Sequence, residues 1–123
     1  LHLFKLISIF LCIGTLIVCG NHSATIESKD AMMLLDDVNY YFLDVRTIKE
    51  HENKSIPSTD CIPVQELEER IDELNKHRKK KIIVYCRSGN RSRTAVKVLK
   101  ENGFNAFNMI GGMNGWEGET IKK

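Results

Sequence analysis

The sequence contains few cysteines. It has four in 123 residues, and Cys12 and Cys19 lie among the first twenty, which leaves Cys61 and Cys86 for a folded domain. Two cysteines are too few for a disulfide framework, and neither a Cys-x-x-Cys pair nor a Cys/His cluster with zinc spacing occurs. We therefore expect no disulfide-rich scaffold and no structural metal.

The chain also lacks an excess of charge of one sign. Its 18 Lys and Arg residues against 16 Asp and Glu give a net charge of +2, which favours neither nucleic acid nor an acidic partner. The basic run 76–81 lies between a helical pattern and an apolar run, and it is typical of a solvated turn. With 42% hydrophobic residues and no internal repeat, the sequence predicts one compact domain and excludes a two-domain enzyme.

The first twenty residues differ in character from the rest. Lys5 is their one full cation, and the apolar stretch 6–18 that follows is short for a bilayer span but typical of a signal-peptide core. The stretch ends at Cys19 in a pattern that resembles a bacterial lipobox. Three other interpretations stay open, namely a leader cleaved just after this cysteine, a short uncleaved anchor, and a buried helix. We expect a signal peptide or lipoprotein leader over 1–20 and a folded domain over 21–123. The protein would then be exported, as a periplasmic protein or a membrane-anchored lipoprotein of the bacterial cell envelope.

Apolar segments predict three strands, 40–45, 82–85 and 104–110. In the first two the apolar run is continuous up to Asp44 or Cys86, which is typical of strands buried in a sheet. The segment between Pro57 and Pro63, which contains Cys61 and Ile62, is long enough only for a brief strand.

Amphipathic or capped segments between these runs predict helices. They are 28–38, 47–50, 64–75 and 92–101. Ser28 is the expected cap of the first helix, and Thr47 and Glu50 have the spacing of a capping box. The alternation of strands and helices indicates an α/β domain with a small, mostly parallel central sheet flanked by helices on both faces.

Cys86 lies where the strand 82–85 passes into a helix, at the edge of the sheet where ligands bind in such folds. If the loop 87–91 curls around the thiol, its backbone N–H groups and the helix N-terminus favour an anion there. Arg87, Arg91 and Arg93 add positive charge. These effects predict a lowered thiol pKa and a reactive cysteine, where a lone cysteine at a strand end is more often a small buried apolar residue.

Small and polar residues complete this loop. Gly89 allows the backbone to turn where a side chain would crowd the centre. Ser88, Asn90 and Ser92 supply further hydrogen-bond donors. The pattern therefore predicts a cradle for a sulfur anion.

The run from Cys86 to Ser92 resembles the active-site loop of single-domain rhodaneses, which are thiosulfate sulfurtransferases. Other segments of that family's pattern occur in the same order. They are Leu43-Asp44-Val45-Arg46, Ile56-Pro57 with Ile62-Pro63, and Ile110-Gly111-Gly112-Met113 with Trp116. The resemblance covers residues 25–118 and implies a rhodanese-like fold. At 54–59 the chain has Lys-Ser-Ile-Pro-Ser-Thr where these relatives have Gly-His-Ile-Pro-Gly-Ala, which puts the geometry of that turn in question.

The resemblance implies that Cys86 is the nucleophile. It would take a sulfane sulfur from a small anionic donor such as thiosulfate, hold it as a persulfide, and pass it to cyanide or a thiol. Arg87 and Arg91 would hold the donor, while Asp44 and Arg46 would brace the loop. The residues implied in substrate binding are Arg87, Ser88, Gly89, Asn90, Arg91 and Ser92.

The same resemblance implies no cofactor and no metal, because the cysteine itself carries the sulfur. We expect no nucleic-acid partner, and contact with a membrane only through the leader or its lipid. A reducing partner protein would protect an exported thiol from oxidation.

Two other functions stay open at this point. A persulfide carrier or sensing module acting with a partner protein needs the same loop. Cysteine phosphatases and arsenate reductases are disfavoured, because phosphatases place an arginine six positions after the cysteine, where this chain has Ser92. Cys61 is interpreted as a core residue, and the alternative is that it is a resolving thiol that forms a disulfide with Cys86. His51 and His77 have no evident partners in the sequence.

Overall fold

A computed structural model describes residues 24–123 of the protein. The predicted leader over 1–20, with Cys12 and Cys19, lies outside the described residues. Within residues 24–123, every helix is too short or too polar to cross a membrane.

Five strands form one parallel sheet in the order β1-β5-β4-β2-β3. They are β1 (Thr25–Glu27), β2 (Tyr40–Asp44), β3 (Asp60–Cys61), β4 (Lys81–Tyr85) and β5 (Asn105–Ile110). The three longer strands and the brief β3 confirm the predicted positions. The sequence does not predict β1, because this edge strand buries only part of one apolar side chain, Ile26, between two exposed residues.

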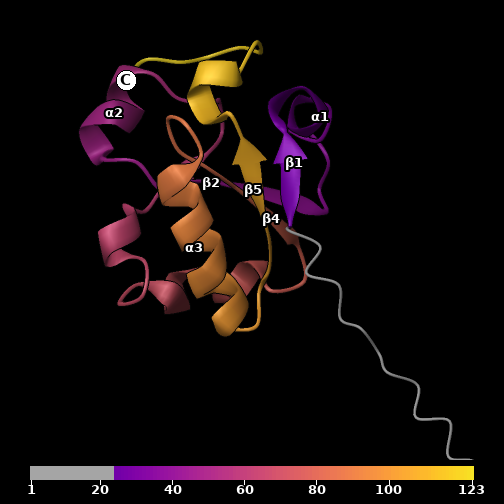
Figure 1. Ribbon diagram of the computed structural model, residues 1–123, viewed down its shortest axis with the longest axis vertical. Coiled ribbons are helices and arrows are strands. Elements are labelled where there is room, and N and C mark those ends of the chain that lie inside the picture. Colours follow the sequence, from indigo (N-terminus) through magenta and orange to yellow (C-terminus); the bar gives the residue numbers. More distant parts are fainter. Residues whose placement is uncertain (1–23) are drawn as a thin grey trace, which may run out of the picture.

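Helical segments pack on both faces of the sheet. They are α1 (Ser28–Met32), α2 (Ile48–Asn53), α3 (Asn90–Glu101) and three 3-10 helices, η1 (Val64–Glu66), η2 (Ile71–His77) and η3 (Gly112–Gly115). In Figure 1, α3 runs along β4 and β5, while α1 adjoins β1. The predicted α/β class with a parallel sheet is confirmed.

The first predicted helix is shorter than expected. It ends at Met32, and Val38, which was expected on its buried face, is 79% exposed. The Asp37 carboxylate accepts the Asn39 N–H at 2.9 Å, so this turn ends the helical path before β2. Ser28 is not the cap, since its hydroxyl donates instead to the Ile110 carbonyl at 3.0 Å.

The segment 64–75 is also different from its prediction. It forms η1 and η2 in place of one amphipathic α-helix. Leu67 and Leu74 are buried as expected. Each lies three residues after another apolar residue, Val64 or Ile71, and that is the spacing at which a 3-10 helix places side chains on one side.

The turn at 54–59 keeps a left-handed position without glycine. Ser58 has a φ of 61°, in the region that favours glycine. Thr59 stabilises the turn, because its hydroxyl donates to the Ile56 carbonyl at 2.8 Å and contacts the Tyr85 hydroxyl, also at 2.8 Å.

The alternation of side chains along β4 separates two hydrophobic cores. Val84 and Cys86 face the core beneath α3, with Leu99. Ile83 and Tyr85 face the opposite core, which Trp116 helps to close. The carboxyl edge of the sheet therefore presents Cys86 toward the start of α3.

Candidate active site

The Cys86 loop, residues 86–91, wraps around the thiol. Cys86 is 1% exposed and directly follows β4. Gly89, with a φ of 108°, turns the chain into α3, and its N–H donates to Cys86 Sγ at 3.0 Å. The predicted curl of the loop around the sulfur is therefore present, with a glycine at its tightest point.

A chain of hydrogen bonds supports the far side of the sulfur. Cys86 Sγ lies 3.3 Å from Ser92 Oγ, and the Ser92 hydroxyl donates to Asn108 Oδ1 on β5. The Asn108 amide donates in turn to the Gly89 carbonyl at 3.1 Å. Asn108 is a site residue that the sequence does not reveal, since it lies inside the predicted strand 104–110 and belongs to none of the segments that carry the resemblance.

The Ser92 hydroxyl has one proton and two neighbours. While Cys86 is a thiol, its S–H can donate to Ser92 Oγ, and the hydroxyl proton goes to Asn108. When the thiol ionises, the sulfur only accepts, so the hydroxyl must turn toward it. Ser92 therefore responds to the charge on the sulfur.

The pKa of Cys86 lies below its ordinary value. Burial raises this pKa, but hydrogen bonds from the Ser92 hydroxyl and from the N–H groups of Ser92, Gly89 and Ser88 lower it by more. The direction agrees with the sequence prediction. The site thus holds a thiolate, or an anion bonded to it, more readily than water does.

Replacing Ser92 with alanine is expected to raise the pKa of Cys86. A hydrogen bond to a charged group contributes about 1.5 to 3 kcal/mol, so the midpoint should move up by about one pH unit or more. Iodoacetamide alkylation of Cys86 against pH measures it. The matched variant Ser88→Ala loses a hydroxyl but keeps its N–H, so the midpoint of its alkylation curve should stay at the wild-type pH. An unmoved midpoint in Ser92→Ala would contradict the role given to Ser92.

The segment 111–114, which begins with two glycines, fixes the start of the Cys86 loop. Met113 N–H donates to the Cys86 carbonyl at 2.9 Å, and Asn114 N–H donates to the Arg87 carbonyl at 3.0 Å. These bonds hold both carbonyls on the outside of the turn. In a trans peptide the N–H points opposite to the C=O, so with the Arg87 carbonyl on the outside the Ser88 N–H turns toward the sulfur.

The three arginines expected near the thiol lie in different surroundings. Arg87 lies within the loop and is exposed. Arg91 forms a two-pronged ion pair with Glu50 of α2, at 2.7 and 3.0 Å. Arg93 instead lines a groove on α3 with Lys97, so its expected place at the thiol is not supported.

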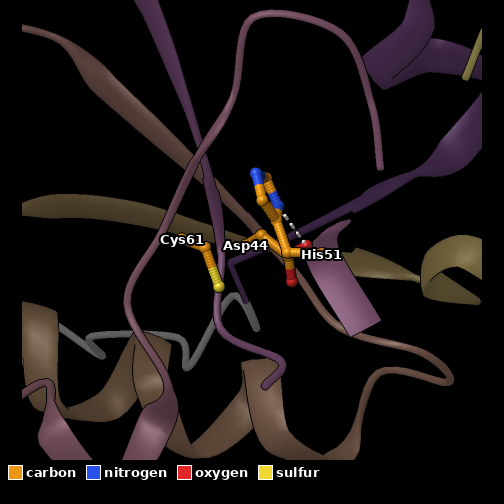
Figure 2. A group of neighbouring side chains, drawn as sticks. All are labelled: Asp44, His51 and Cys61. Carbon is orange, nitrogen blue, oxygen red and sulfur yellow. Dashed lines mark hydrogen bonds and ion pairs between the residues drawn. The ribbon is translucent and has the colours of Figure 1, made fainter. Parts of the chain in front are cut away.

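Asp44 and Arg46 form a buried ion pair at the end of β2. Arg46 Nη2 lies 2.7 Å from Asp44 Oδ2 and also donates to the Lys54 carbonyl at 2.6 Å. His51 joins them, with Nδ1 2.9 Å from the same carboxylate oxygen (Figure 2), so the expectation that it lacks a partner is wrong. Within residues 24–123 these side chains make no hydrogen bond to the loop 87–91, so they brace α2 and the turn after it.

Cys61 lies beside this network, but its donor set does not resemble a metal site. Ligand atoms of Asp44, His51 and Cys61 lie within 4.8 Å of one another. Figure 2 shows the three side chains as neighbours. The carboxylate already accepts three hydrogen bonds from the Arg46 side chain, whose positive charge opposes a cation. The Cys61 S–H donates to the Arg46 carbonyl, and burial raises its pKa to about 12.

The geometry also excludes Cys61 as a resolving thiol for Cys86. Cys61 pairs with Asp44, which pairs with Tyr85, so it lies two strands from β4 and on the face opposite to Cys86. Two strand spacings are about 10 Å, beyond the roughly 7 Å limit for the Cα atoms of a disulfide. The alternative interpretation of Cys61 is therefore wrong.

Comparison with known proteins identifies the family of the chain. A family model described as the rhodanese-like domain matches residues 27–119. The chain belongs to the rhodanese-like family. A rhodanese-like domain protein from Staphylococcus aureus has a crystal structure that matches with a TM-score of 0.72 at 30% identity, covering 80% of this chain and 97% of that one.

Two Bacillus subtilis proteins resemble this rhodanese-like chain in sequence. One, provisionally named a sulfur carrier protein, YrkF, is 40% identical over 85 residues, which are 68% of this chain and 45% of the relative. The other, provisionally named a sulfurtransferase, YtwF, is 39% identical over 87 residues, which are 71% of this chain and 82% of the relative. The rhodanese-like chain thus spans less than half of YrkF and most of YtwF.

Proposed function

We propose that this protein is a sulfurtransferase that carries a sulfane sulfur as a persulfide on Cys86. The observation that carries the proposal is the cradle around Cys86 Sγ, where the Gly89 N–H lies at 3.0 Å and Ser92 Oγ at 3.3 Å. Relatives provisionally named as a sulfurtransferase and a sulfur carrier support a role in sulfur transfer or sulfur carriage. The donor would be a small anion such as thiosulfate, and the acceptor cyanide or a thiol.

The reaction needs two displacements at sulfur. The Cys86 thiolate attacks the outer sulfur of thiosulfate, the S–S bond breaks, and sulfite leaves with the electron pair. The acceptor then attacks the outer sulfur of the persulfide, which forms thiocyanate or a new persulfide and returns the Cys86 thiolate. The thiolate and the persulfide are both anions, so N–H groups directed at the sulfur stabilise each one in turn.

The residue six positions after Cys86 argues against phosphate chemistry. Ser92 stands where a phosphatase has arginine, and it bonds the sulfur and Asn108 instead.

Sulfur uptake by the whole chain tests the proposal. Protein incubated with thiosulfate should gain the mass of one sulfur atom on the peptide containing Cys86, and added cyanide should then release thiocyanate over many cycles. Uptake without turnover would replace the enzyme by a persulfide carrier that needs a partner protein. No uptake from any donor would overturn the proposal.

We also propose that the protein is exported to the cell envelope. The apolar stretch 6–18 and the lipobox-like end at Cys19 support this. The mass of the N-terminal peptide, isolated from the native cells, distinguishes cleavage, lipidation and retention, and an intact unmodified N-terminus in the cytosol would contradict export. An exported persulfide cysteine would depend on a reducing partner protein.

A further inference from the structure

We propose that Glu50 sets the donor specificity of the Cys86 site, shifting its preference from doubly charged toward singly charged sulfane donors. The inference rests on the proposed sulfurtransferase function and narrows its donor class. Glu50 is absent from the residues that the sequence implies in the site, although it lies in a recognisable capping box.

The first observation is the pairing of Glu50 with Arg91. Both oxygens of the Glu50 carboxylate bind the Arg91 guanidinium, at 2.7 and 3.0 Å. The two side chains are 33% and 32% exposed, so the pair lies at the surface of the site. The guanidinium that was expected to hold the donor is therefore neutralised by a carboxylate from another element.

The second observation is the position of this carboxylate beside the Cys86 loop. Glu50 and Arg87 line one groove of about 360 Å³. Its other lining residues are Arg46, Asn53, Lys54, Met113 and Asn114. Arg46 is paired with Asp44, whereas in the described part of the chain the Arg87 side chain forms no ion pair. Because Arg87 belongs to the Cys86 loop, a donor that enters through this groove meets the negative charge of Glu50 together with the positive charges of Arg87 and Lys54.

The size of the effect follows from Coulomb's law. For an assumed separation of about 6 Å, and an effective dielectric between that of protein and water, one unit charge changes binding by about tenfold for each charge on the donor. A dianion feels Glu50 twice as strongly as a monoanion does. The carboxylate should therefore lower the preference for thiosulfate over a singly charged donor by about tenfold.

Glu50 also has a structural role that one substitution can preserve. Thr47 Oγ1 accepts the Glu50 N–H at 3.1 Å, and Glu50 Oε1 accepts the Thr47 N–H at 3.4 Å. Glutamine closes a capping box as glutamate does, through the same side-chain oxygen. The variant Glu50→Gln therefore keeps the start of α2, removes the negative charge, and replaces one of the two oxygens that accept from Arg91 by an NH2 group.

Two sulfur donors with the same reacting bond but different net charge distinguish an effect of donor charge from an effect of donor reactivity. Thiosulfate is a dianion and methanethiosulfonate a monoanion, and in both an outer sulfur is bonded to an oxidised sulfur. With methanethiosulfonate the Cys86 thiolate attacks the outer sulfur, the S–S bond breaks, and methanesulfinate leaves with the electron pair. The measured quantity is kcat/KM for each donor in the full chain, with cyanide as acceptor.

In Glu50→Gln, the ratio of kcat/KM for thiosulfate to that for methanethiosulfonate is expected to rise about tenfold, and added salt should reduce the rise. Glu52→Gln is the matched control, since it removes an exposed carboxylate from the same helix without touching Arg91, and its ratio should stay at the wild-type value. Thermal unfolding confirms that both variants fold.

An equal change for both donors in Glu50→Gln would overturn the inference, because it would mean that Glu50 only positions Arg91. The same ratio change in Glu52→Gln would also overturn it. If the wild-type chain takes sulfur from neither donor, the proposed function fails. If it takes sulfur from both and Glu50→Gln leaves the ratio unchanged, the function stands and only this inference fails.

Discussion

Replacing Cys86 with serine is expected to abolish sulfur uptake and to lower turnover by more than about 1,000-fold. The serine hydroxyl fits the cradle and can accept the Gly89 N–H that now donates to Sγ at 3.0 Å. However, a hydroxyl stays protonated at working pH and forms no persulfide. The fold should survive, because the substitution removes little volume from a site that is 1% exposed. Thiocyanate production and the mass of the sulfur-loaded protein measure both losses.

Cys61→Ser is the control for this experiment. Cys61 is the other cysteine in the part of the chain that the structure describes, and it faces the opposite side of the sheet. Its pKa is raised to about 12, so it is a thiol at neutral pH and a poor nucleophile. Turnover should be retained in Cys61→Ser. Loss of sulfur uptake in this variant, with uptake retained in Cys86→Ser, would reassign the sulfur carrier.

Replacing Gly112 with alanine is expected to disrupt the cradle without touching the thiol. The added Cβ would lie 2.3 Å from the Cys86 carbonyl oxygen and 2.7 Å from that of Arg87, so backbone must move. A displacement of about 1 Å in a catalytic group costs about 100-fold in rate. We expect turnover to fall by at least about that factor, and the free energy of unfolding to fall by about 2 to 4 kcal/mol.

The variant Gly111→Ala is the control that distinguishes the steric clash expected in Gly112→Ala from the strain of a left-handed backbone. Both glycines have positive φ, 81° and 50°, but a Cβ at Gly111 would have no neighbour closer than 3.8 Å. Its cost should be the left-handed conformation alone, about 1 to 2 kcal/mol, with most of the activity kept. Chemical denaturation and thiocyanate release measure the two effects. Equal losses of activity in both variants would contradict the role of Gly112 as a close contact of the loop.

The sequence predicts the local parts of this molecule well. The unbroken run before Cys86 predicts β4, and the spacing of Thr47 and Glu50 predicts the capping box that starts α2. Both depend on residues close together along the chain, so pattern and spacing are sufficient. The loop around Cys86 also forms as expected, because its glycine and the start of α3 are encoded within seven consecutive residues.

Contacts between distant segments could not be predicted in this way. Glu50 and Arg91 are 41 positions apart, and Ser92 and Asn108 are 16 apart in different elements. The partner of Asp44 is a neighbour, Arg46, but the place of His51 depends on α2 folding back over the end of β2. The charge of Arg91 is visible in the sequence, whereas its neutralisation by Glu50 appears only once the sheet brings α2 beside α3.

The bonds from Met113 and Asn114 to the Cys86 loop also impose an order on how the site matures. These residues follow all five strands in the chain, so a growing polypeptide acquires its cysteine well before it acquires the groups that turn the loop N–H groups inward. Until then we expect Cys86 to have the pKa of an ordinary thiol. We therefore expect the proposed sulfur loading to be efficient only on a nearly finished domain, and incomplete or C-terminally clipped chains not to compete for the sulfur.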